Sequence, residues 1–308
     1  MLPGMLPGDR WRSIRASTVM PTWLQAIVVC AALAACSKTG SKSGSKTEGA
    51  KTEAAKVETA KAETVTVVKD FPGDACSPAE YDALLKKYVK AGKVDYAALK
   101  ASKADLDAFE AYLVQIGGCD VSKLSGPAHD AFWVNAYNAF NIKGVLDAWP
   151  IENIKSVPGF LDKKQYRVAN MDLTINDMEY KQLIPKHQEA RHHFAVVCAD
   201  LGSVPLESHA YTAEELEAKL DKKTREFVAD PNNFSVDIPN KKVRVSMLFS
   251  PEWYEKDFLI DKKFRGKKAV EYLIPYVDKP TAEFLAGGDY TVSYIDWNWA
   301  LNGVAASK

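Results

Sequence analysis

Hydrophobic and polar positions divide the chain into three parts. An apolar run at 23–33 follows a segment that contains Arg10, Arg12 and Arg15. Residues 37–64 carry almost no large apolar side chain, and from about residue 74 apolar positions recur at helical or strand spacing as far as 301. The pattern predicts an apolar leader at 1–35, a segment at 36–73 that cannot form a core, and one globular domain at 74–308.

Helical spacing dominates the first half of the globular part. Ser77 and Pro78 suit a helix start, and Gly92 suits its end. Residues 127–149 are predicted to form the most aromatic helix, buried on most sides. Asn176 is expected to cap a short helix at 177–184, which would place Glu179 near a surface.

Strands are predicted at scattered places between the helices. The apolar run at 194–197 suits a strand buried on both faces, 234–238 and 243–247 alternate as a hairpin, and 290–295 alternates as a last strand. Helices outnumber strands. The expected fold is therefore α+β, a single domain with a small mixed or antiparallel sheet surrounded by helices.

The first seventy residues predict where in the cell the protein is located. An apolar run of eleven residues is too short to span a bilayer and reads as a secretory signal. Leu33-Ala34-Ala35-Cys36 resembles the lipobox of bacterial lipoproteins, which implies acylation of Cys36, and Ser37 then suggests the outer membrane, facing the periplasm. An ordinary signal peptide cut after a small residue is the alternative. Residues 36–73, rich in Lys, Glu, Ala and Thr, are expected to act as a tether.

Charge and cysteine content limit the possible partners and the possible disulfides. The 40 basic and 40 acidic residues balance, so no overall field favours a nucleic acid partner. The globular part keeps Cys76, Cys119 and Cys198, so at most one internal disulfide forms. Cys76 with Cys119 is the preferred pair, because both lie in turn-like contexts. The alternative is three reduced, buried cysteines.

Asn135, Asn138 and Asn141 lie among the aromatic residues of the helix at 127–149. A buried amide costs on the order of 1 to 3 kcal/mol unless its donors and acceptor are paired. The preferred interpretation is that these side chains tie the helix to neighbouring loops. A direct role in ligand binding is the alternative.

Four separated motifs carry a family resemblance. They are F-W-V-N-A-Y-N at 132–138, H-F-A-V-V-C at 193–198, L-x-S-P-x-W-Y-x-x-D-F around 253–258, and D-W-N-W-A-L-N at 296–302. In this order they resemble the domain-of-unknown-function 547 family, whose members are often exported or lipid-anchored bacterial proteins. The candidate ligand-binding residues are taken from these motifs: Asn135, Asn138, Trp253, Tyr254 and Asp296.

The sequence departs from the family at one position. Members commonly read C-x-x-x-G-C-P-x-L after the apolar run, whereas this chain has Ser203 in place of the second cysteine. If that cysteine is a nucleophile in relatives, the chain has exchanged it for a hydroxyl that needs stronger activation by a base. If the two cysteines form a disulfide in relatives, Cys198 is left without its partner.

Catalysis by Cys198 or Ser203 with His193 as base is the chemistry to test. In a regular strand, His193 and Cys198 point to opposite faces and His192 lies about 20 Å from Cys198. A partner must then come from elsewhere, and the polar candidates are Asn135, Asn138, Glu179, His209 and Asp296. The spacings show no metal motif and no cofactor fingerprint, so neither is expected.

Two functions follow from these observations. The first is a cell-envelope lipoprotein that binds or scaffolds an envelope peptide, glycan or protein in a cleft lined by aromatic and Asn side chains. The second is a thiol- or serine-dependent hydrolase or acyl transferase that acts on an envelope substrate. The hydrolase or acyl transferase function has a geometric requirement. The side chains of His193, Cys198 and Ser203 must converge with an Asn or Glu on one open cleft.

Overall fold

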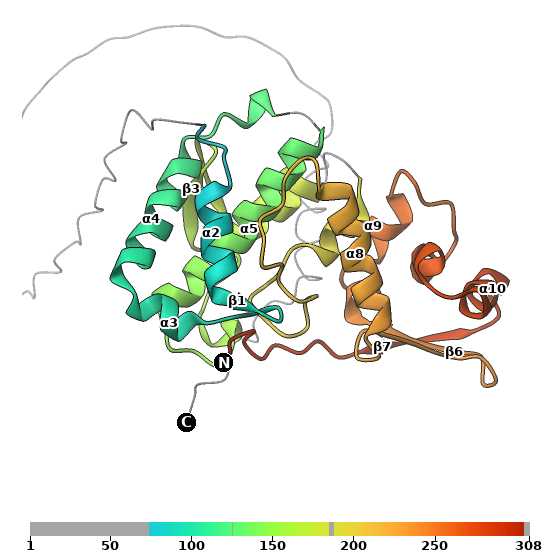
Figure 1. The fold of residues 1–308 in the computed structure, drawn as a ribbon. Coiled ribbons are helices and arrows are strands. Elements are labelled where there is room, and N and C mark those ends of the chain that lie inside the picture. Colours follow the sequence, from blue (N-terminus) through green and yellow to red (C-terminus); the bar gives the residue numbers. More distant parts are fainter. Residues whose placement is uncertain (1–73, 125, 185–187, 305–308) are drawn as a thin grey trace, which may run out of the picture.

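A computed structural model describes residues 74–124, 126–184 and 188–304. The predicted signal peptide, Cys36 and the tether lie outside these residues. The first half of the described chain is helical (Figure 1). Its helices are α2 (Ala79–Tyr88), α3 (Tyr96–Ala101), α4 (Lys103–Gly117) and α5 (Gly126–Ala148), with short 3-10 turns η1 (Val121–Lys123) and η2 (Ile154–Ser156).

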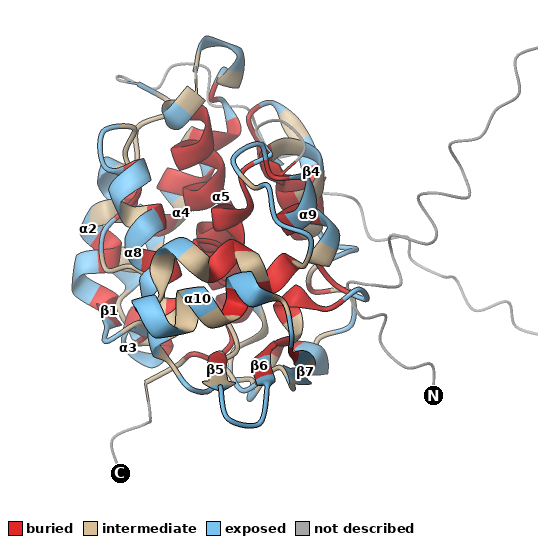
Figure 2. Ribbon diagram, turned by 90° about the vertical axis from the view of Figure 1, so that its right-hand side faces the viewer, coloured by how far each residue is buried: buried red, intermediate tan, exposed pale blue. Residues whose placement is uncertain are grey.

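Helix α5 is the centre of the first hydrophobic cluster. Every residue from His129 to Ile142 is buried, which Figure 2 shows as an almost continuous red helix. A helix that is buried all round has to be covered on all sides, and the elements that pack on it include α3, α4, α6 (Ile175–Asp177) and α8 (Leu216–Ala229). The disulfide preferred from the sequence, Cys76 with Cys119, is present and joins the start of α2 to the end of α4.

Among the described residues, three small sheets accompany the helices. Strands β1 (Val89–Lys90) and β2 (Lys93–Val94) form one antiparallel pair, and β3 (Gln165–Val168) and β4 (Met171–Thr174) form another. Strands β5 (Phe234–Asp237) and β6 (Lys242–Ser246) form the predicted hairpin. The predicted last strand is β7 (Thr291–Ile295), which pairs parallel to β6. The expected α+β class is therefore confirmed.

A second hydrophobic cluster fills the other half of the domain. Phe194, Phe227, Phe249 and Phe258 pack against one another at its centre. The surrounding elements are α8 (Leu216–Ala229), η5 (Met247–Phe249), α9 (Glu255–Ile260), η6 (Ala269–Tyr276) and α10 (Lys279–Gly287). Trp299 packs against both clusters and so marks their junction.

The helix expected at 177–184 differs from its prediction. It begins earlier, as α6 (Ile175–Asp177), because Thr174 and Asp177 form a reciprocal capping box, so the prediction of Asn176 as the cap is wrong. It continues as a π-helix, η3 (Met178–Leu183). Glu179 is 2% exposed, so its predicted place near a surface is also wrong. Segment η3 packs on α5, and this contact encloses the carboxylate.

The strand predicted at 194–197 is absent from the described structure. The segment η4 (Ala190–Phe194) is a 3-10 turn, and residues 195–198 form no strand although Ala195, Val196 and Val197 are buried. The amide of Asn138 explains the difference: it donates to the carbonyl oxygen of Ala195 (3.0 Å) and accepts from the backbone N–H of Val197 (2.8 Å). One side chain thus supplies the bonds that a neighbouring strand would have supplied.

Asn135 braces a second segment in the same way. Its amide donates to the carbonyl oxygen of Tyr211 (2.8 Å) and accepts from the Tyr211 N–H (2.9 Å). Both asparagines are 3% exposed. For these two side chains the contacts agree with the preferred interpretation that they tie the helix to neighbouring loops. Asn141 instead donates to Tyr137 O within its own helix.

The segment after β7 crosses from the second cluster to the first. The Leu301 N–H donates to Glu152 O (2.9 Å) and the Asn302 N–H donates to Ala199 O (3.1 Å). Asn302 also accepts the Tyr96 hydroxyl (2.8 Å), while its carbonyl accepts the Val94 N–H (2.9 Å). These bonds fasten 297–303 along the junction of the two clusters. Within the part of the chain that the structure describes, no helix has the length and apolarity needed to cross a bilayer.

Candidate functional site

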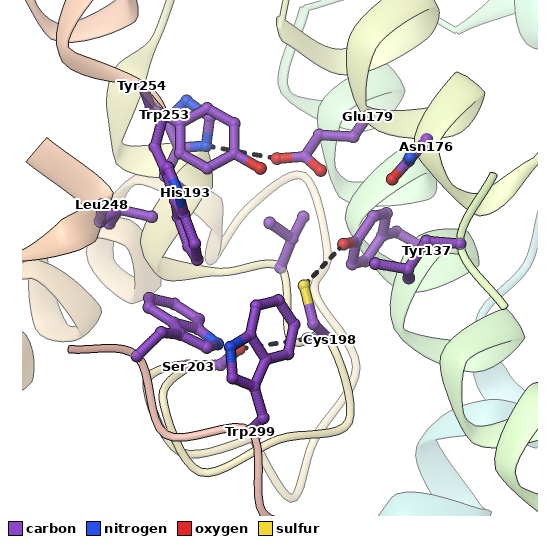
Figure 3. A pocket seen from close by; sticks show the side chains of 13 residues that line it. Tyr137, Asn176, Glu179, His193, Cys198, Ser203, Leu248, Trp253, Tyr254 and Trp299 are labelled. Atoms are coloured by element: carbon purple, nitrogen blue, oxygen red, sulfur yellow. Dashed lines mark hydrogen bonds and ion pairs between the residues drawn. The ribbon is translucent and has the colours of Figure 1, made fainter. Parts of the chain in front are cut away.

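A pocket opens at the junction between the two hydrophobic clusters (Figure 3). It is bordered by α5, η3, the irregular segment at 193–203, the turn before α9 and the segment after β7. Its volume open to water is about 30 Å³, which is room for about two water molecules. The lining residues are Tyr137, Leu161, Asn176, Glu179, His193, Val196, Cys198, Ser203, Leu248, Trp253, Tyr254, Trp297 and Trp299.

Cys198 lies at one side of the pocket with its sulfur 3.0 Å from the Tyr137 hydroxyl oxygen. Burial raises the pKa of its thiol well above the ordinary value, and the negative charges of Asp200 and Glu179 raise it further. These effects outweigh the hydrogen bonds from Tyr137 and Ser203, which lower it. The thiolate is the nucleophilic form, so the surroundings of Cys198 favour an unreactive thiol.

Ser203 is held by a turn rather than directed at a base. Its hydroxyl accepts the Cys198 N–H (3.2 Å) and donates to a carboxylate oxygen of Asp200 (2.9 Å), which also accepts the Ser203 N–H (2.9 Å). The other oxygen of Asp200 accepts the indole N–H of Trp297 (2.9 Å). Asp200 therefore joins the turn to the crossing segment, and burial raises its pKa above the ordinary value.

Gly202 lies under the Trp297 ring. A Cβ atom at this position would lie 2.5 Å from Cε2 of Trp297, closer than any real contact. The absence of a side chain therefore lets the indole pack directly on the turn.

His193 lies between two carboxylates. Its Nδ1 atom is 3.3 Å from Glu179 Oε1 and its Nε2 atom is 3.0 Å from Asp257 Oδ2, and the ring packs on Tyr254 with centroids 4.1 Å apart. Burial alone lowers the pKa of His193, but the bonds and charges of Asp257 and Glu179 outweigh it and raise the pKa to about 9. At neutral pH the ring is charged and each nitrogen faces a carboxylate, so it is not a free general base.

Three tryptophans form one wall of the pocket. The ring centroids of Trp253 and Trp297 are 5.1 Å apart, those of Trp253 and Trp299 are 6.0 Å apart, and those of Trp297 and Trp299 are 6.3 Å apart. Tyr254 continues this wall towards His193. The Lys155 ammonium lies over the Trp299 ring, 5.0 Å from the ring centroid.

The structure brings together most of the predicted site residues. His193, Cys198, Ser203, Trp253 and Tyr254 all line the pocket. Cys198 and His193 both line it, although the segment that carries them is not the strand on which the distance argument rested.

The remaining predicted residues lie elsewhere. Asn135 and Asn138 use their amides on backbone groups, so the expected Asn-lined cleft is wrong for these two residues. Asp296 is exposed and does not line the pocket. His209 lies on the surface, 3.6 Å from Asp82.

Sequence reasoning missed Tyr137 as a thiol partner, Glu179 as a buried carboxylate, and Trp297 and Trp299 as a wall. The motif D-W-N-W alternates, so its two tryptophans share a side opposite Asp296, and this period of two was the available signal. Among the described residues, no group of three or more His, Cys, Asp or Glu side chains is arranged to hold a metal ion.

The fold and site together define an α+β domain in which buried ionic groups and an aromatic wall meet at one pocket. Residues 96–228 match the family model described as "Protein of unknown function, DUF547". The resemblance to this family drawn from the sequence is therefore confirmed over residues 96–228. No curated protein and no solved structure matched the chain.

The family match divides the pocket into two contributions. Tyr137, Glu179, His193, Cys198 and Ser203 lie inside the matched segment. The tryptophan wall and Tyr254 lie beyond residue 228. The matched segment therefore supplies the buried polar groups and the rest of the chain supplies most of the aromatic surface.

Proposed function

We propose that this protein is a cell-envelope lipoprotein that binds a small envelope ligand, a peptide or glycan fragment, without reacting with it. The observation that carries the proposal is the state of the polar groups in the pocket. Burial and nearby negative charge keep Cys198 as a thiol, and each ring nitrogen of His193 faces a carboxylate. A pocket with aromatic walls and a few fixed polar groups is typical of a binding site.

The proposed location rests on the leader and on the low-complexity segment. A basic segment, an apolar run and Leu33-Ala34-Ala35-Cys36 favour acylation at Cys36 and attachment to the outer membrane, on the periplasmic side. Metabolic labelling with palmitate tests this. Label is expected in the wild-type chain and is expected to disappear in a Cys36→Ser variant, and equal labelling of both would contradict the anchor.

Ligand binding can be measured through the tryptophans of the pocket. Titration of the full chain with soluble muropeptides and cell-wall saccharides is expected to change the intrinsic fluorescence saturably, because Trp253, Trp297 and Trp299 line the pocket. A Trp297→Phe/Trp299→Phe variant is expected to lose most of the change. The matched control is Trp149→Phe, since Trp149 packs against Tyr96 rather than lining the pocket. Loss of the signal in the control alone would refute this assignment.

A second candidate function is a thiol- or serine-dependent hydrolase or acyl transferase. One observation favours it: His193, Cys198, Ser203 and Glu179 line a single pocket, as a catalytic set would. The reaction of Cys198 with a thiol-reactive probe at pH 8 distinguishes the two functions. Because its pKa is raised, the expected rate is at least about tenfold below that of free cysteine.

The difference between the wild type and a Cys198→Ala variant isolates the signal of Cys198 from that of Cys30 and Cys36. A rate equal to or above that of free cysteine would favour the enzyme and would overturn the binding proposal.

A further inference from the structure

We infer that the pocket recognises a primary ammonium group on a slim alkyl chain. The group is held between the Glu179 carboxylate and the part of the aromatic wall that Trp253, Tyr254 and Trp297 form. This inference rests on the proposed function, because it names the chemical class of the ligand. A lysine-like side chain on an envelope peptide has this chemistry. Figure 3 shows the Glu179 carboxylate, the Tyr254 ring and the Tyr137 hydroxyl directed toward one space.

The first argument is the incomplete pairing of Glu179. Its side chain is 3% exposed and lines the pocket. Its carboxylate makes one ion pair among the described residues, with His193 Nδ1 at 3.3 Å, and that nitrogen lacks a well-formed hydrogen bond. A carboxylate accepts about four hydrogen bonds, and a buried charge is costly when they are missing. A ligand that brings several N–H donors would complete this pairing.

The second argument is the sign of the charge around the pocket. Burial is the main cause of the raised pKa values of Tyr254, Tyr137 and Cys198, and the negative charge of Glu179 adds to each of them. Three lining groups on different elements thus sense the same negative potential.

The positive charges near the pocket do not cancel this potential. His193 is the one basic side chain among the described lining residues, and it is shared between Glu179 and Asp257. The local balance of these three groups is one negative charge. An anionic ligand would be repelled, whereas a cation would be attracted.

The third argument is the combination of aromatic surface and narrow space. The faces of Trp and Tyr attract cations, most strongly where water is excluded. Trp253 and Tyr254 are 5% and 7% exposed, so this wall is largely dry. The space open to water is about 30 Å³, so the end of a slim alkyl chain fits it better than a branched group.

The test compares three probes of equal shape on the full chain at pH 7. The probes are n-butylammonium, n-butanol and butyrate, measured at equal ionic strength by tryptophan fluorescence and by calorimetry. The expected result is saturable binding of n-butylammonium at least about tenfold tighter than that of n-butanol, with no saturable binding of butyrate, because a charged hydrogen bond is stronger than a neutral one.

A Glu179→Gln variant is expected to lose this preference while it keeps its affinity for n-butanol. The matched control is Glu252→Gln, which removes one charge from the exposed neighbour of Trp253 and is expected to keep the preference. If Glu179→Gln does not fold, the comparison of the three probes on the wild-type chain still tests the inference. Tetramethylammonium is expected to bind at least about tenfold more weakly than n-butylammonium, because it has no N–H group to donate to the Glu179 carboxylate.

The outcomes separate this inference from the proposed function. Equal affinity for n-butylammonium and n-butanol, or binding of muropeptides and saccharides without binding of the amine, would overturn the inference and leave a binding protein. Retention of the preference in Glu179→Gln would also overturn it. Absence of saturable binding for every probe, muropeptides and saccharides included, would overturn the proposed function itself.

Discussion

Replacement of Asn138 by Ala tests how the buried segment at 195–197 is held without a strand partner. The change removes the two hydrogen bonds that the Asn138 amide makes with that segment, one donated to Ala195 O and one accepted from the Val197 N–H. Both backbone groups belong to buried residues. Each buried group left unpaired costs about 1 to 3 kcal/mol, so the two together cost roughly 2 to 6 kcal/mol. A domain is stable by only about 5 to 15 kcal/mol, so the loss is large.

Helix α5 offers a matched control in Asn141. It is 1% exposed, so Asn141→Ala removes the same atoms from an equally buried position of the same helix. Its side-chain amide donates to Tyr137 O, within the helix, and its side-chain oxygen accepts no hydrogen bond from the described residues. Asn141→Ala should therefore cost less than Asn138→Ala by at least about 2 kcal/mol, while Asn135→Ala should resemble Asn138→Ala.

Urea unfolding at pH 7, followed by far-UV circular dichroism, measures these differences. Equal slopes of free energy against urea would show that each variant exposes the same surface on unfolding. Equal losses for Asn138→Ala and Asn141→Ala would refute the reasoning, because cavity formation alone would then account for both. A loss in Asn138→Ala with unchanged protection of the Val197 amide from hydrogen exchange would also contradict it.

Two further predictions concern His193 and Gly202. The pKa of His193 is raised from an unfolded value near 6.5 to about 9, so its stabilisation is fully present below about pH 6.5 and is lost as the pH rises through 9. The unfolding free energy should fall over this range by on the order of 3 kcal/mol more in the wild type than in His193→Gln, and parallel pH curves would contradict this. Gly202→Ala is expected to displace the Trp297 ring, to shift tryptophan emission to longer wavelength and to weaken ligand binding, since a Cβ there lies 2.5 Å from the ring. Gly287→Ala, with open space around its Cβ, is the control, and an unchanged emission spectrum in Gly202→Ala would show that the ring does not depend on the glycine.

Much of the fold followed from local patterns in the sequence. The hairpin of β5 and β6 and the buried, aromatic helix α5 were predicted because alternation and helical spacing act within one element. The run at 194–197 was correctly expected to be buried, but its element type was wrong. The apolar character of four residues does not determine whether their backbone groups form hydrogen bonds with a strand or with a side chain. Here the Asn138 side chain forms two of these hydrogen bonds.

The site was predictable to a smaller extent, because its polar partners come from distant parts of the chain. Glu179 and Asp257 approach His193 from elements 14 residues before and 64 residues after it, so no spacing motif joins them. The partner of Cys198 proved to be Tyr137 rather than any of the candidates, since a phenol in an aromatic helix looks like core packing. The tryptophan pair at 297 and 299 was visible as an alternation, but only the crossing segment brings it to the pocket.

The crossing segment also sets when the pocket can form during folding. Its bonds to Tyr96 and Val94 join residues about 206 positions apart, as between Tyr96 and Asn302. Loop closure over such distances is entropically costly, so contacts of this kind form late, after the helical first cluster has local contacts to stabilise it. A chain with both hydrophobic clusters assembled but residues 297–303 undocked would lack two tryptophans of the wall. The ability to bind ligand is therefore expected to return in the slowest refolding phase, after the helices have re-formed.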